Sequence, residues 1–127
     1  MERYQDVEKA VRFLQPAIPL HIYRQRSVQK AAKWFTKNFR GKVLFAVKTN
    51  ADARVLQDMY EAGIMHYDVA SIAEVKLVHD ILPQAKKYYM HPVKPRESIK
   101  SAYFDYGVRD FSLDSFVELE KILAATN

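Results

Sequence analysis

Short runs rich in β-branched and aromatic residues alternate along this chain with longer segments in which apolar residues recur at helical spacing. The short runs predict β-strands, because compact apolar stretches bounded by turn residues pack well in sheets. Four strands are predicted, over residues 42–47, 66–70, 87–91 and 109–113. With Leu44, Tyr67, Tyr89 and Phe111 as their middles, successive strands are 23, 22 and 22 residues apart. This nearly constant spacing predicts four copies of one structural unit.

Each predicted strand is followed by a predicted helix with one apolar stripe. The stripes cover residues 55–60, 72–81, 99–106 and 116–123. Helix-ending residues follow the first three helices, as Gly63, Pro83 and Gly107. The third helix is predicted to begin at Pro95, because the fixed φ of proline suits the first helical turn. Each unit is therefore predicted to be one strand followed by one helix.

Strands that are joined by single helices run parallel, because a helical crossover returns the chain to the same end of the sheet. The sequence therefore predicts an α/β fold with a parallel (βα)4 array over residues 41–127. The spacing is compatible both with an open doubly wound sheet and with half of a closed barrel. A complete barrel takes about 250 residues, so a chain of 127 residues has room for about half of one.

Residues 1–40 do not follow the repeat and are predicted to form an amino-terminal lead-in. Within it, residues 7–14 are predicted as a helix and residues 20–23 as a strand that follows Pro19. Residues 28–39 are predicted as an amphipathic helix with two large aromatic side chains, Trp34 and Phe35. We expect this lead-in to contact a partner domain.

Composition narrows the classes of function. The chain has no cysteine, which excludes disulfides, thiolate metal sites and a cysteine nucleophile and is compatible with the cytoplasm. The start is polar and no apolar run reaches about 18 residues, so we expect neither a signal peptide nor a membrane span. The formal net charge of +5 is spread along the sequence without a recognition motif, so we expect no nucleic-acid partner. No metal site is predicted.

Residues suited to catalysis follow the predicted strands. They are Lys48 with Thr49 and Asn50, Asp68 with Ser71, His91, and Asp114. The carboxyl ends of parallel strands share one rim, so we expect these side chains to line a catalytic mouth. Lys48 follows four apolar residues, and partial burial there favours a neutral, nucleophilic amine. A solvated lysine at a strand end is the alternative interpretation.

The segment Phe-Ala-Val-Lys-Thr-Asn at residues 45–50 resembles the motif around the cofactor lysine of the fold-type III pyridoxal-phosphate-dependent decarboxylases. The resemblance continues with the same order and spacing over residues 20–126. The matching positions are 55–56, Gly63, 68–71 with Glu74, 91–94, Ile99, Ala102, 107–108 and 114–115 with 118–119. A co-linear series of this length is stronger evidence than one short motif. It implies that the array is half of an alanine-racemase-like TIM barrel.

By this resemblance, Lys48 holds pyridoxal 5′-phosphate as an internal aldimine and Ala46 lies close behind the cofactor ring. Asp68 and Glu74 resemble the acidic residues that interact with the lysine amine and neighbouring polar groups. For Glu74 a structural role is an equal alternative, because residues 71–74 also fit a helix capping box.

Two further positions have structural interpretations. Asp114 and Ser115, with Glu118, are interpreted as the start of a helix. His91 stands where the family more often has asparagine or glycine, and it is a minor candidate for substrate contact. The alternative that we favour for His91 is a side chain packed at the end of a strand.

The resemblance implies decarboxylation of a small-molecule basic amino acid of the ornithine or lysine type, polyamine biosynthesis and a homodimer of the full-length protein. Diaminopimelate, arginine and carboxynorspermidine relatives remain alternatives. The chain has no glycine-rich turn after a later strand, no late carboxylate for the pyridine nitrogen and no cysteine–aspartate motif. We therefore expect little activity from this chain alone, and a noncatalytic interaction or regulatory protein is the alternative from another class.

Overall fold

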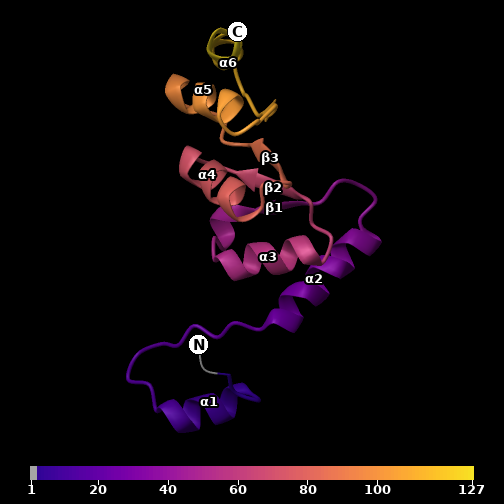
Figure 1. Cartoon of the computed structure of the whole chain (residues 1–127), viewed down its shortest axis with the longest axis vertical. Helices are drawn as coiled ribbons and strands as arrows, with labels where there is room; N and C mark the ends of the chain where they lie inside the picture. Colours follow the sequence, from indigo (N-terminus) through magenta and orange to yellow (C-terminus); the bar gives the residue numbers. More distant parts are fainter. Residues whose placement is uncertain (1–2) are drawn as a thin grey trace.

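The computed structural model describes residues 3–127, in which strands and helices alternate along the chain (Figure 1). After the helices α1 (Val7–Leu14) and α2 (Gln25–Asn38), the repeat begins with β1 (Leu44–Ala46), the 3-10 helix η1 (Val47–Thr49) and α3 (Ala53–Glu61). It continues with β2 (His66–Val69), α4 (Ile72–Ile81), β3 (Lys86–Tyr89), α5 (Arg96–Phe104), β4 (Asp110–Phe111) and α6 (Phe116–Thr126). The predicted α/β class is confirmed.

The four strands form one parallel sheet in the order β1-β2-β3-β4. Their register aligns Ala46, Asp68, Tyr88 and Asp110 in one row across the sheet. Neighbouring strands in sequence are neighbours in space, as expected when each helix returns the chain to the next position. The predicted parallel (βα)4 array is confirmed.

The core lies between one face of the sheet and the helices. Tyr67 and Val69 of β2 are fully buried, and Tyr89 of β3 is nearly so. They pack with apolar residues of α3, α4 and α5, among them Leu56 and Val75. Full burial of one such aliphatic side chain contributes about 1.5–3 kcal/mol. The buried hydroxyl of Tyr67 donates a hydrogen bond to the carbonyl oxygen of Leu56 at 2.9 Å, so burial leaves no unpaired polar atom there.

The other face of the sheet is more polar and has no helix packed on it within residues 3–127. Side chains alternate between the two faces of a strand, so the residues of the polar face follow from the register. They are Leu44, Ala46, His66, Asp68, Lys86, Tyr88 and Asp110. A doubly wound sheet carries helices on both faces, whereas a barrel carries them only on the outside. The one-sided cover therefore favours the half-barrel alternative.

Several boundaries differ from the predictions. The first strand ends at Ala46, because residues 47–49 turn into η1, in which the Thr49 hydroxyl donates to the Ala46 carbonyl oxygen at 2.7 Å. Pro95 is the N-cap residue of α5 and stands one position before the helix. Gly63 and Gly107 have positive φ of 103° and 68°, conformations that glycine adopts without the strain of a Cβ atom. Local stop signals thus predicted the ends of α3 and α5 well.

The lead-in contains the two predicted helices, but the predicted strand at residues 20–23 is wrong. That segment pairs with no strand, and Leu20 and Ile22 are 41% and 40% exposed. A strand requires a neighbouring edge, and this segment runs outside the sheet. Its Tyr23 hydroxyl instead donates to the carbonyl oxygen of Arg54 at 3.3 Å.

Helix α2 packs against α3, whereas α1 lies apart from the sheet (Figure 1). Gln25 and Gln29 donate to the carboxylate of Asp58 at 2.7 and 3.0 Å. Burial and the nearby charge of Glu61 raise the pKa of Asp58.

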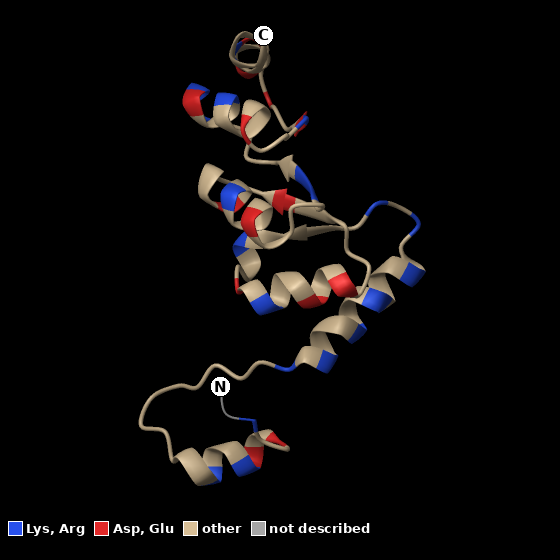
Figure 2. Ribbon diagram, viewed as in Figure 1, with Lys and Arg blue, Asp and Glu red and all other residues tan. Residues whose placement is uncertain are grey.

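Basic residues are concentrated in one segment, so the expected even spread along the chain is wrong. Residues 24–42 hold seven Lys and Arg and no Asp or Glu. Arg26, Lys30, Lys33 and Lys37 recur at helical spacing along α2 (Figure 2).

Within residues 3–127, no helix combines the length and apolar character that crossing a membrane requires. The same residues contain no cluster of His, Asp or Glu arranged to hold a metal ion.

Candidate cofactor site at the carboxyl ends of the strands

Lys48 lies in the turn η1, directly after β1 at the carboxyl end of the sheet. Its side chain is exposed, so the expected partial burial is wrong for this chain. The predicted strand extended to Val47, but the structure begins the turn η1 at that residue, and Val47 is the only residue of η1 that is buried. Within residues 3–127, the Lys48 amine makes no hydrogen bond or ion pair. An amine in this state is accessible to an aldehyde.

Ala46 and Asp68 lie side by side on the polar face near this rim. They are register partners on β1 and β2, which are about 4.8 Å apart in a sheet. Both are half-buried, and the Asp68 carboxylate has no hydrogen-bond or ion-pair partner within residues 3–127. The structure therefore brings Lys48, Ala46 and Asp68 to one end of neighbouring strands.

Glu74 has the structural role that the sequence offered as an alternative. The Ser71 hydroxyl accepts the Glu74 backbone N–H at 3.2 Å, and the Glu74 carboxylate accepts the Ala70 backbone N–H at 2.8 Å. These two contacts are a capping arrangement at the start of α4. One carboxylate oxygen is thus used by the backbone, and a contact of Glu74 with a cofactor stays a prediction.

His91 follows β3 and is exposed, so the interpretation as a packed side chain is wrong. Its Nδ1 accepts the backbone N–H of Val93 at 3.1 Å, which closes a turn. The short loop projects from the sheet end without a covering element, and this accounts for the exposure. Substrate contact by His91 stays a prediction.

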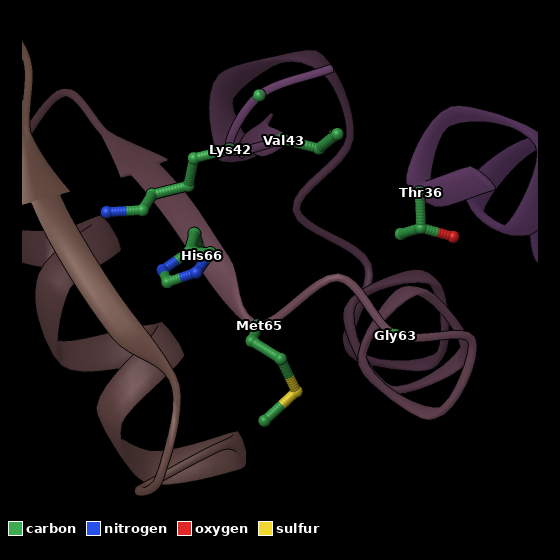
Figure 3. A pocket seen from close by; sticks show the side chains of 7 residues that line it. Thr36, Lys42, Val43, Gly63, Met65 and His66 are labelled. Carbon is green, nitrogen blue, oxygen red and sulfur yellow. The ribbon is translucent and has the colours of Figure 1, made fainter. Parts of the chain in front are cut away.

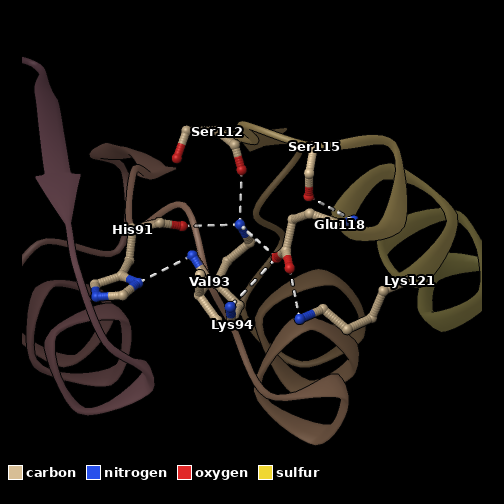
Figure 4. A network of polar contacts seen from close by, with 7 residues as sticks. All are labelled: His91, Val93, Lys94, Ser112, Ser115, Glu118 and Lys121. Carbon is tan, nitrogen blue, oxygen red and sulfur yellow. Dashed lines mark hydrogen bonds and ion pairs between the residues drawn. The ribbon is translucent and has the colours of Figure 1, made fainter.

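A buried ion pair beside His91 was not predicted (Figure 4). The Lys94 ammonium lies 3.0 Å from the Glu118 carboxylate, and their side chains are 0% and 5% exposed. Ser115 caps α6 through the Glu118 backbone N–H, as predicted, but the Glu118 carboxylate contacts Lys94 and Lys121. The sequence shows only the capping pattern at Ser115 and Glu118. Lys94 lies 24 residues before Glu118, and the fold brings the two together.

The pKa of Glu118 reflects two opposing effects. Burial raises it, because a charged carboxylate loses its water. Hydrogen bonds from Lys121 and Lys94, together with their positive charges, outweigh burial and lower the pKa below its ordinary value of 4.5. Glu118 is therefore a carboxylate in the folded chain near neutral pH.

The amino end of the sheet has a second polar group of residues. Lys86 pairs with Asp110 at 2.8 Å, and the Tyr88 hydroxyl lies 3.3 Å from Nδ1 of His66. Burial, followed by the charges of Lys42 and Lys86, lowers the pKa of His66. A cavity of about 260 Å³ opens beside His66 (Figure 3) and is lined by Thr36, Gly41, Lys42, Val43, Gly63, Met65 and His66. It lies at the opposite end of the strands from Lys48, so we do not assign the cofactor site to it.

Comparison with known proteins identifies relatives for nearly the whole chain. Residues 24–127 match the family model described as "Pyridoxal-dependent decarboxylase, pyridoxal binding domain". A lysine/ornithine decarboxylase from Selenomonas ruminantium is 29% identical over 129 aligned residues, which cover 98% of this chain and 32% of that protein.

Solved structures agree with this match. The crystal structure of lysine decarboxylase from Selenomonas ruminantium has a TM-score of 0.81 and 28% identity, and the match covers 98% of this chain and 33% of that one. The arginine decarboxylase of Paramecium bursaria Chlorella virus has a TM-score of 0.80 and 27% identity, over 91% and 32% of the two chains. The chain thus spans about a third of the length of the relatives it matches.

Proposed function

This chain belongs to the pyridoxal-dependent decarboxylases, since residues 24–127 match the model of their pyridoxal-binding domain, and we propose that Lys48 binds pyridoxal 5′-phosphate covalently in a decarboxylase of basic amino acids. The observation that carries the proposal is the Lys48 amine, exposed and unpartnered within residues 3–127, at the carboxyl rim of a parallel sheet. Active sites of β/α barrels lie at this rim. The lysine, ornithine and arginine substrates in the names of the relatives support the substrate class.

The residues near Lys48 fit the aldehyde and ring end of the cofactor. Ala46 has a small side chain on the polar face, which leaves room for a flat ring beside it. Asp68 supplies a carboxylate one strand away, suited to hold a cationic amine. The three glycines, Gly41, Gly63 and Gly107, all precede strands and so lie at the other end of the sheet. In this proposal the pyridine nitrogen and most of the phosphate oxygens are held by parts of the longer protein.

Lys48, Asp68 and Ala46 have different tasks in the proposed reaction. Lys48 would hold the cofactor aldehyde through its amine. Asp68 would accept a hydrogen bond from the Lys48 amine or from the substrate amine, and Ala46 would lie behind the ring without crowding it. When bound, the cofactor supplies the electron sink that stabilises the charge left after loss of carbon dioxide.

The product of such a reaction is a di- or polyamine, and we assign the longer protein to polyamine biosynthesis on the lysine/ornithine branch. A lysine/ornithine decarboxylase among the relatives supports this assignment. A homodimer and a cytoplasmic location are further parts of this proposal, drawn from the family resemblance and the composition.

An absorbance titration with pyridoxal phosphate tests the assignment of Lys48. We expect saturable binding by the 127-residue chain and a loss of about tenfold or more in affinity for Lys48→Ala, because the covalent link is absent. Lys42→Ala is the matched control, since this exposed lysine precedes β1 and lies at the other end of the same strand. Equal binding by both variants would contradict the proposal and favour a noncatalytic role.

A further inference from the structure

The buried side chain of Lys94 joins the two rim loops that follow β3 and β4. Its Nζ donates to the carbonyl oxygens of His91 and Ser112 at 2.8 and 2.7 Å and lies 3.0 Å from the Glu118 carboxylate. These acceptors use all three hydrogens of the ammonium group. Because the side chain is 0% exposed, water is not available to replace any of them. The carbonyl of His91 is therefore fixed relative to β4 and α6.

The imidazole of His91 is also held in one orientation. Its Nδ1 accepts the backbone N–H of Val93, a group that can only donate. Nδ1 is therefore the unprotonated nitrogen, and the neutral ring carries its hydrogen on Nε2. The ring is turned away from Lys94 and Glu118 (Figure 4), and the residue is exposed at the rim. The loop thus presents one hydrogen-bond donor, Nε2–H, to a ligand.

We propose that Lys94 is a positioning residue that, through His91, presents Nε2–H to an anionic oxygen bound at the rim. The proposal rests on the function proposed above, because the anionic oxygen belongs to the phosphate of a cofactor held by Lys48 or to the carboxylate of an amino acid beside it. Lys48 follows β1 and His91 follows β3, two strands or about 10 Å away. A group at the far end of a ligand anchored at Lys48 spans such a distance.

Two pairs of ligands identify the anionic oxygen. In the phosphate arm, absorbance titrations give the dissociation constants of pyridoxal phosphate and of pyridoxal, which lacks the phosphate. In the carboxylate arm, ornithine and 1,4-diaminobutane, which lacks the carboxylate, release the bound aldehyde from Lys48. In one of the two pairs, His91→Phe is expected to weaken binding of the anionic ligand about tenfold and to leave binding of the ligand without the anion unchanged. This is the size expected for one charge-assisted hydrogen bond.

Three further variants separate positioning from mere folding. His91→Asn keeps an acceptor for Val93 but no donor at the Nε2 position, so we expect the loss seen for His91→Phe. Lys94→Met is expected to reproduce most of this loss, although its side chain is buried away from the ligand. Lys100→Met changes an exposed lysine on α5 and is the control. It is expected to leave unchanged the ratio of the two affinities within each pair of ligands. If Lys94→Met loses its circular dichroism signal, Lys94→Met with Glu118→Leu replaces it, because no buried charge is left unpaired.

The outcomes are distinct. Unchanged ratios in His91→Phe and Lys94→Met overturn this inference and leave Lys48 as the cofactor residue. A loss confined to His91→Phe overturns the positioning role of Lys94. If the wild-type chain binds neither aldehyde at Lys48, the proposed function fails and this inference fails with it.

Discussion

Two lysines near the rim, Lys48 and Lys94, differ in their burial and in their hydrogen-bond partners. The Lys48 amine is exposed and unpartnered within residues 3–127, so it is available for chemistry. Lys94 is buried with three acceptors, so it holds loops together. An exposed amine without partners is accessible to an aldehyde, whereas a buried ammonium group whose three hydrogens are all bonded is not. The surroundings of each side chain, rather than its residue type, separate the two roles.

Removing one member of the Lys94–Glu118 pair is expected to destabilise the chain strongly. Glu118→Leu should cost about 3–5 kcal/mol in the free energy of unfolding, because it leaves the buried Lys94 ammonium without an anionic partner. Lys94→Met should cost less, because Lys121 still pairs with the Glu118 carboxylate. The double variant should cost far less than the sum, because it leaves neither charge in the core. Urea unfolding of the four proteins measures these values, and additive losses would contradict the expectation.

The pH dependence of the same proteins gives a second check. The pKa of Glu118 is lowered on folding from 4.5, so its carboxylate stabilises the chain above that pH and loses this effect as the pH falls. The stability of the wild type should therefore fall more steeply below pH 4.5 than that of the double variant. Parallel curves for the two proteins would contradict a paired Glu118.

At the scale of elements, local signals predicted most of the fold. The strand–helix period, the cap residues Ser71 and Ser115 and the glycine stops all act within a few residues of the chain. The failures involve contacts between distant segments. The strand at residues 20–23 lacks an edge to join, and the buried partner of Glu118 lies on another loop. The exposure of Lys48 and His91 depends on what packs over the rim, and a linear pattern does not contain this information.

Gly107 tests the backbone of one such stop signal. Its φ is 68°, and an added Cβ would meet no atom within 4 Å, so any cost of substitution comes from the backbone alone. Gly107→Val is expected to cost about 1–2 kcal/mol, because β-branched residues avoid this region. Gly107→Asn, which tolerates a left-handed conformation, is the matched control and should cost less. Equal costs in thermal or urea unfolding would indicate that the turn relaxes.

At the scale of the whole molecule, the sheet has one covered face and one rim that bears the proposed chemistry. The helices pack on the side opposite to Ala46 and Asp68, as in half of a barrel. The period predicted the array but did not decide between a barrel and an open sheet. The chain spans about a third of its relatives, and in our proposal the pyridine nitrogen and most of the phosphate oxygens are held by the longer protein.

The central claim is that Lys48 is the residue that captures the cofactor aldehyde. The most direct test is to mix the chain with pyridoxal phosphate, reduce with borohydride and locate the modified lysine by peptide mass mapping. The account predicts that the label lies predominantly on Lys48, with little on the exposed Lys42 and Lys76 and none on the buried Lys94. A label spread over the exposed lysines without preference, or concentrated on a lysine other than Lys48, would contradict it.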